Sequence, residues 1–117
     1  EIDKVIVALN KIMPFNLHVL DGLTVCGAKT LRLGLVMASR DPVATDAVAA
    51  TIMGVNPKSV AHLKLAEREG LGKIEFAVKG GDLDYFRRRF PRKSISEKVL
   101  AFGYRVACKL GLDKRII

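Results

Sequence analysis

The chain has 117 residues, of which 50% are hydrophobic and 27% are charged, and its formal net charge is +8. This composition excludes a wholly disordered protein, and the length suits one domain. The longest apolar run falls well short of the roughly 20 residues of a membrane span, and the first residues do not resemble a signal peptide. We therefore expect residues 1–117 to form one domain that is not integral to a membrane. We also expect this domain to be a fragment of a longer chain.

Apolar periodicity and turn residues predict seven elements. Spacings of three and four between apolar residues favour helices, and short apolar or alternating runs favour strands. In chain order we predict a helix over 2–13, strands over 17–20 and 33–39, helices over 43–53 and 59–69, a strand over 74–78 and a helix over 94–110. Residues 82–90 fit either a short helix or an arm. This order predicts an α/β fold, a small mixed sheet with helices packed on it, as the C-terminal portion of a larger domain.

Some of these predictions carry more detail. Asp21 and Gly22 form a turn after the first strand, and a loop continues from there to residue 32. The second strand is apolar throughout, which is typical of a central strand covered on both faces. Asp41 is placed to cap the helix that follows, with Pro42 at its first position.

Three carboxylates are candidates for a ligand site. In α/β sheets ligands bind beyond the carboxyl ends of strands, and Asp21 and Asp41 follow two predicted strands, so they would border one crevice if those strands are neighbours. Asp46 lies one turn into an apolar helix, where we expect it to be buried and paired. Structural roles stay open for all three: a turn for Asp21, an N-cap for Asp41, and an ion pair with a group such as Arg40 for Asp46.

The cysteines and histidines predict neither a metal centre nor a nucleophilic site. Cys26 and Cys108 form no CxxC pair and are half of the thiolates that an iron–sulfur cluster needs, although they fit a reducing cytoplasm. His18 and His62 have no partner at ligand spacing, so we expect partly buried or surface histidines. The sequence has no glycine-rich phosphate loop, and the residues assign no enzymatic reaction.

Positive charge is concentrated in the last third of the chain. Residues 79–117 carry 11 of the 20 Lys and Arg residues but only 4 of the 12 acidic ones. The candidate basic surface consists of Arg87, Arg88, Arg89, Arg92 and Lys93. Nucleic acid is the least favoured partner, although the interleaved aromatic residues could stack on bases. The last helix has basic and apolar residues on different sides, which fits an anionic membrane or packing on its own core.

Two strings of residues carry a resemblance to a known family. DPVATDAVAATIMG over residues 41–54 and PKSVAHLKLAEREGLG over residues 57–72 resemble the uncharacterised family called domain of unknown function 362. The segment Val19-Leu20-Asp21-Gly22 is similar to a family strand that ends in VDG, with one residue inserted. The resemblance covers a family-like core over residues 1–80 and leaves residues 81–117 as a basic helical extension.

The resemblance implies a cytoplasmic prokaryotic protein whose relatives are often joined to a ferredoxin module with [4Fe–4S] clusters. The family's activity is not established, and redox chemistry is what that module implies. The resemblance therefore implies a ligand-binding or redox-associated domain with no cofactor in this chain, whose cluster lies in a neighbouring module. Its partner would be that module or the rest of its own chain. The alternative function, which rests on the basic last third of the chain, is a binding module that contacts nucleic acid, an anionic membrane or an acidic partner. A common family site would fall on Asp21, Gly22, Asp41, Pro42 and Asp46.

Overall fold

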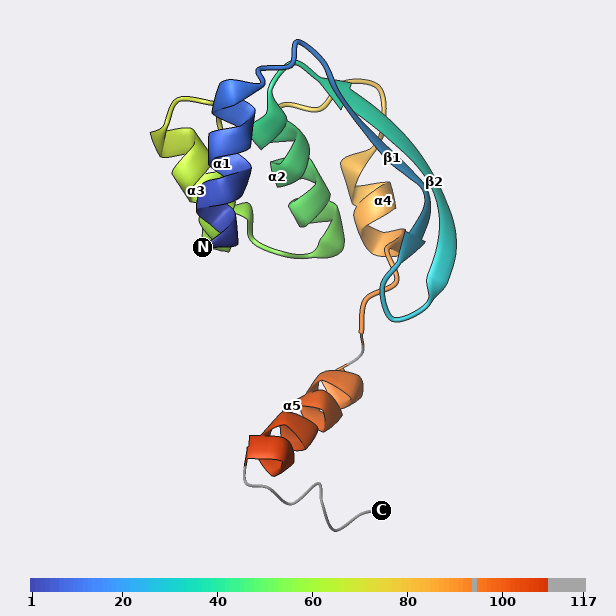
Figure 1. The fold of residues 1–117 in the computed structure, drawn as a ribbon. Coiled ribbons are helices and arrows are strands. Elements are labelled where there is room, and N and C mark those ends of the chain that lie inside the picture. Colours follow the sequence, from blue (N-terminus) through green and yellow to red (C-terminus); the bar gives the residue numbers. More distant parts are fainter. Residues whose placement is uncertain (94, 110–117) are drawn as a thin grey trace.

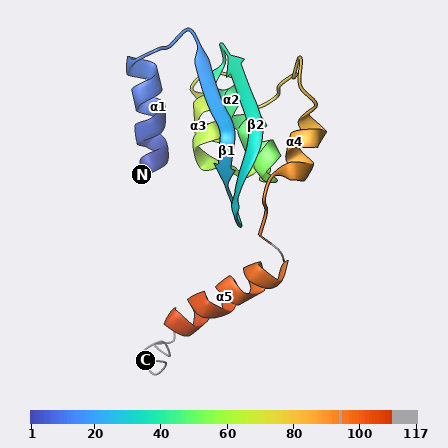
Figure 2. The same cartoon turned by 90° about the vertical axis from the view of Figure 1, so that its right-hand side faces the viewer.

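The computed structural model describes residues 1–93 and 95–109, and these residues form a small α/β fold. The elements are α1 (Ile2–Ile12), β1 (His18–Cys26), β2 (Thr30–Ser39), α2 (Pro42–Met53), the 3-10 turn η1 (Pro57–Ser59), α3 (Ala61–Arg68), α4 (Leu83–Arg89) and α5 (Ile95–Lys109). Helices α2 and α4 lie on the concave side of the β1–β2 hairpin, α3 packs against α2, and α1 packs against α3 (Figures 1 and 2). The predicted α/β class is confirmed.

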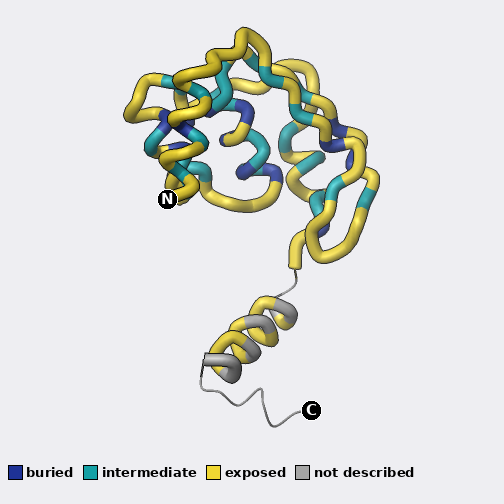
Figure 3. Tube along the Cα trace, viewed as in Figure 1, coloured by how far each residue is buried: buried dark blue, intermediate teal, exposed yellow. Residues whose placement is uncertain are grey.

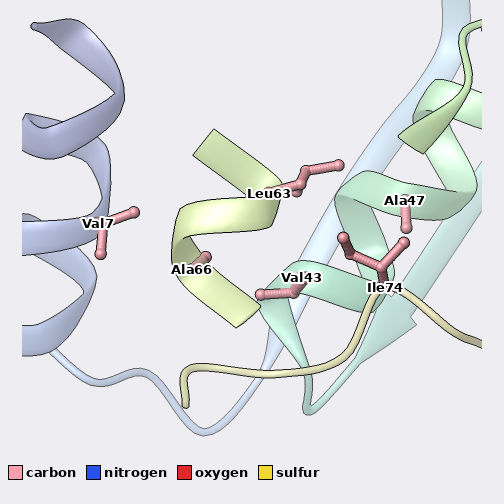
Figure 4. Close-up of a cluster of buried hydrophobic side chains, with 6 residues drawn as sticks. All are labelled: Val7, Val43, Ala47, Leu63, Ala66 and Ile74. Atoms are coloured by element: carbon pink, nitrogen blue, oxygen red, sulfur yellow. The ribbon is translucent and has the colours of Figure 1, made fainter. Parts of the chain in front are cut away.

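Helix α2 is apolar nearly all round because it separates two hydrophobic clusters. The helical cluster consists of Val7, Val43, Ala47, Leu63, Ala66 and Ile74 (Figure 4). The sheet cluster consists of Leu33, Leu35 and Ile52, against which Val25, Val48, Leu83, Phe86 and Phe90 pack. One side of α2 thus faces α1 and α3, and another side faces the hairpin and α4. A helix covered on two sides in this way needs few polar residues.

The sheet differs from its prediction in two ways. Its two strands are antiparallel, so the sheet of the described residues is not mixed, and the predicted loop to residue 32 is largely strand. Leu33 and Leu35 are buried, whereas Val36 is 58% exposed, so β2 is covered on one face and not on both (Figure 3). An apolar run does not reveal how many faces are covered, and here it concealed an ordinary alternation.

Residues 74–78 form no strand and pair with none in the described part of the chain, so the predicted strand is wrong. The backbone N–H of Lys73 donates to Asp41 Oδ2 at 2.8 Å, and the N–H of Ile74 donates to Glu67 Oε1 at 2.8 Å. Ile74 is buried in the helical cluster, and Phe76 packs against it. The apolar alternation therefore reflects packing on helices, and side chains supply the bonds that a neighbouring strand would otherwise make.

The helix predictions are confirmed within a few residues. Gly54 ends α2 in the left-handed conformation, with φ of 79°. The helix predicted over residues 59–69 starts later, at Ala61, because the preceding Asn56-Pro57 pair begins the turn η1 instead. Residues 82–90, left open between helix and arm, form α4. Of the last helix, residues 94 and 110 lie outside the described residues.

The helical cluster predicts where stability is most sensitive to substitution. Leu63 is 2% exposed, so Leu63→Ala should lower the free energy of unfolding by about 2–5 kcal/mol through lost burial and a residual cavity. Leu9→Ala makes the same change at a side chain that is 53% exposed and should cost much less. Urea denaturation of both variants measures the difference, and equal losses would contradict the assigned core.

Candidate ligand-binding site

Asp41 caps α2 and also ties this helix to a distant segment. Its Oδ1 accepts a hydrogen bond from the Ala44 N–H at 2.9 Å, and its Oδ2 accepts one from the Lys73 N–H at 2.8 Å. Its own N–H donates to Ser39 Oγ at 3.0 Å. A Cβ on Gly72 would lie 1.9 Å from Asp41 Oδ1, so the chain passes the carboxylate as closely as glycine allows. Both oxygens of Asp41 therefore have structural partners, as the N-cap interpretation predicts.

Asp46 is not mostly buried as predicted, because its side chain lies at the rim between α2 and the neighbouring helices and is 53% exposed. Its Oδ2 lies 3.8 Å from His62 Nε2, and His62 Nδ1 lies 3.8 Å from Asp3 Oδ1. Partial burial raises the pKa of Asp46, and the charges of His62 and His18 oppose that shift. The adjoining cavity of about 30 Å³ has room for about one water. Asp46 therefore belongs to an ion-pair bridge between helices.

Asp21 and Gly22 lie within β1 and not after it, so the turn predicted at these residues is wrong. Gly22 is buried against Leu35, and Asp21 is exposed, opposite Val36 in the ladder. The Asp21 Oδ1 accepts a hydrogen bond from the N–H of Leu23, the single residue of β1 that lies opposite Leu33 and Gly34 of β2 where the register shifts. The bulge in β2 disrupts the ladder here, and Asp21 supplies a partner for this N–H. Its side chain points to the outer face of the hairpin, so the structure does not bring it together with Asp41.

A cleft of about 360 Å³ lies along the edge of β2, and none of the three carboxylates lines it. Residues 34–39 form one wall, and consecutive residues line it because the cleft follows the edge of the strand. Further walls come from the inner side of α2 and from residues 76–79, completed by Gly81, Leu83 and Phe86. Strand β1 occupies the other edge of β2, and within residues 1–93 and 95–109 no backbone hydrogen bond uses the edge in the cleft.

The cleft is apolar apart from backbone groups and a few side chains. From α2 it receives Ala44, Thr45, Val48 and Ile52. The Thr45 hydroxyl is engaged, because it donates to the Asp41 carbonyl at 3.0 Å. Among the described lining residues, Lys79 alone carries a charge. The cleft therefore offers a ligand a row of backbone groups, apolar walls and one ammonium group.

One residue of the predicted basic surface has a structural role. Arg92 donates from Nη2 to the carbonyls of Ile52, at 3.3 Å, and of Arg87, at 2.9 Å. It thereby joins the C-terminal ends of α2 and α4, where a positive charge is favourable. A Cβ on Gly54 would lie 2.8 Å from the guanidinium carbon, so this glycine leaves space for the arginine.

The other basic residues are exposed. The Arg89 guanidinium lies 5.3 Å from the centre of the Tyr85 ring, a cation–π contact within α4. Arg87 and Arg88 line a shallow hollow of about 590 Å³, and Lys93 follows the helix. These side chains form a positively charged surface near the point where the chain continues to α5.

The comparisons with known proteins identify one family. Residues 1–51 match the family described as Domain of unknown function (DUF362). No curated protein and no solved structure matches the chain. The resemblance expected from the sequence is confirmed over this stretch.

The DUF362 match covers the hairpin and most of α2. It includes Asp21, Gly22, Asp41 and Asp46, which support the bulge, the helix cap and the ion-pair bridge. It also includes two walls of the cleft, β2 and α2. Residues 76–86, which complete the cleft, lie outside the match. The matched residues therefore supply mainly the framework of this site.

Sequence analysis missed the cleft and the His62 bridge. Gly34, which lines the cleft and has φ of 74°, is a local signal of the irregularity in β2, because a strand glycine often marks a bulge. No local signal joins His62 to Asp46, since they lie on different helices. The described residues hold no group of three or more His, Cys, Asp or Glu arranged for a metal ion, and no described helix is long and apolar enough to cross a membrane.

Asp41 and Asp46 should differ in their effect on stability. Asp41→Ala removes the acceptor of two backbone N–H groups and should lower the free energy of unfolding by about 1–2 kcal/mol. Asp46→Ala removes a half-exposed ion pair and should cost no more than about 1 kcal/mol. Chemical denaturation of the two variants tests this order. A larger loss for Asp46→Ala would show that the ion-pair bridge matters more than the cap.

Proposed function

We propose that this domain binds a small, mainly apolar molecule in the cleft along β2. The observation that carries the proposal is the unpaired backbone edge of residues 34–39, which lies inside a cavity of about 360 Å³. The groups of a strand edge repeat at alternate residues, so they suit a ligand with hydrogen-bonding groups along one side. The volume is within the range of small-molecule sites, about 300–1,000 Å³.

The charge in the cleft supports a ligand with a negative end. Lys79 is exposed to the cleft, and no described lining residue is acidic. An ammonium group at the rim of an apolar cavity favours a carboxylate or a similar anion there. The described lining residues also include no His, Asp, Glu or Cys that could move a proton, so we propose binding and assign no reaction.

We propose further that a [4Fe–4S] cluster serving this redox-associated domain belongs to a neighbouring module, as the family resemblance implies. Such clusters are held by about four thiolates, and this chain contains two cysteines. Cys26 is exposed at the end of β1 with a free thiol, and its Sγ accepts a long hydrogen bond from Thr30 Oγ1 at 4.0 Å. These donors do not fit a cluster. The same resemblance supports a prokaryotic cytoplasm, where such a thiol stays reduced.

The cleft predicts where a simple amphiphile binds. In an NMR titration of the ¹⁵N-labelled chain, sodium hexanoate should shift the amide signals of residues 34–39 and 76–79, and hexan-1-ol should do so more weakly. Ala77→Trp should abolish both effects, because Ala77 is exposed and lines the cleft. Lys79→Ala should weaken hexanoate binding roughly two- to fivefold and leave hexan-1-ol unchanged.

Matched controls separate the cleft from the rest of the surface. Ala8→Trp and Lys4→Ala make the same changes at exposed positions of α1 that do not line the cleft, so both should bind like the unmodified chain. Unshifted amides along β2 with both probes, or undiminished binding to Ala77→Trp, would contradict the proposed function.

The thiol count predicts the outcome of cluster reconstitution. Anaerobic treatment of the 117-residue chain with iron and sulfide, followed by desalting, should leave no stoichiometric iron and no visible cluster spectrum. Cys26→Ser is the control and should give the same background. A stoichiometric cluster that disappears in Cys26→Ser would make this chain the redox centre itself.

A further inference from the structure

Helix α5 has no contact with the rest of the described fold. Every other helix packs against another element, but none of the contacts between elements within residues 1–93 and 95–109 includes α5. Figures 1 and 2 show it separated from the helices and the hairpin in both views. Packing on its own core, one of the two uses open from the sequence, is therefore not what this structure has.

The exposed surface of α5 combines an apolar stripe with basic residues. Val99, Phe102 and Val106 follow one another at helical spacing and are 64%, 69% and 40% exposed. Lys98 and Arg105, which are also exposed, are seven residues apart and so lie together beside this stripe. The helix thus has the pattern of an amphipathic interfacial helix, with basic groups next to an apolar face.

The partner that matches both the apolar stripe and the basic residues beside it is an anionic lipid surface. Nucleic acid would neutralise Lys98 and Arg105 but would leave the apolar stripe in water. An apolar protein groove would cover the stripe and leave the basic groups without partners. Lipid headgroups carry phosphates above an acyl layer, so one surface takes both. At about 1.5 Å per residue the 15 residues of α5 are shorter than the roughly 30 Å hydrocarbon layer, which suits a helix lying along the surface.

We propose that α5 docks on an anionic membrane surface, with Val99, Phe102 and Val106 in the headgroup layer and Lys98 and Arg105 on lipid phosphates. The exposed Arg87, Arg88 and Lys93 add positive charge just before the helix. The membrane contact is independent of the cleft, because no residue of α5 lines it. The interaction would hold the domain at the membrane without spanning it.

Vesicle flotation of the 117-residue chain tests this proposal. The chain should float with vesicles of phosphatidylcholine and phosphatidylglycerol, remain in solution with phosphatidylcholine alone, and dissociate as salt is raised. Lys98→Glu should reduce the partition coefficient by more than the roughly fivefold expected for loss of one basic group. Phe102→Ser should reduce it at least as strongly, even at low salt, because the apolar contact is lost.

Two control variants make the same changes away from α5. Lys4→Glu and Phe15→Ser alter exposed residues of α1 and of the chain that follows it, and Phe15 is 59% exposed. Both should float like the unmodified chain. Because α5 contacts no other element, its variants should keep the NMR spectrum of the folded hairpin and helices.

The same samples separate the competing partners. Equal flotation with neutral and anionic vesicles would overturn the proposal, because Lys98 and Arg105 would then have no role in binding. Tight binding to a DNA duplex that Phe102→Ser leaves unchanged, without flotation, would assign the surface to nucleic acid. A dimer in light scattering that depends on Phe102, again without flotation, would show that a second copy covers the stripe.

Discussion

The N-terminus of α2 is the junction on which the described fold depends. Asp41 connects the end of β2 through Ser39, the first turn of α2 through Ala44, and the chain after α3 through Lys73. Because α2 forms part of both hydrophobic clusters, fixing its start also fixes where α1, α3 and the hairpin pack. A carboxylate with two backbone donors does this with one side chain, and shorter or apolar residues at position 41 would lose both bonds.

The cleft exists because the hydrogen bonds at this junction hold the segment after Lys73 at a distance from the edge of β2. An isolated two-stranded sheet is marginal in water, and the hairpin depends on α2 and α4 to cover its concave face. Residues 76–79 pass nearby without forming a strand, and their approach is set by bonds from the N–H groups of Lys73 and Ile74 to Asp41 and Glu67. The segment therefore lines the edge of β2 across a cavity and does not extend the sheet.

Local signals predicted the helices well and the strands poorly. The cap at Asp41 and the stop at Gly54 are properties of neighbouring residues, so α2 could be placed almost to the residue. Residues 74–78 show the alternation of a strand, but a strand also needs a partner, which no local pattern supplies. The same limit explains the candidate site. The pairing of Asp46 with His62 and the outward position of Asp21 depend on how separate elements pack.

Residues inside and outside the DUF362 match contribute differently to the cleft: the first supply its shape and backbone groups, and the second supply its charge. The DUF362 match contains the β2 edge and the α2 wall, which offer backbone groups and apolar surface to any ligand of suitable shape. Lys79 lies beyond the match, on the third wall, and it carries the charge. Selection for an anionic ligand, like the membrane contact of α5, therefore rests on residues outside the matched part. A ligand recognised through the matched residues alone would be neutral and would depend on the edge of β2.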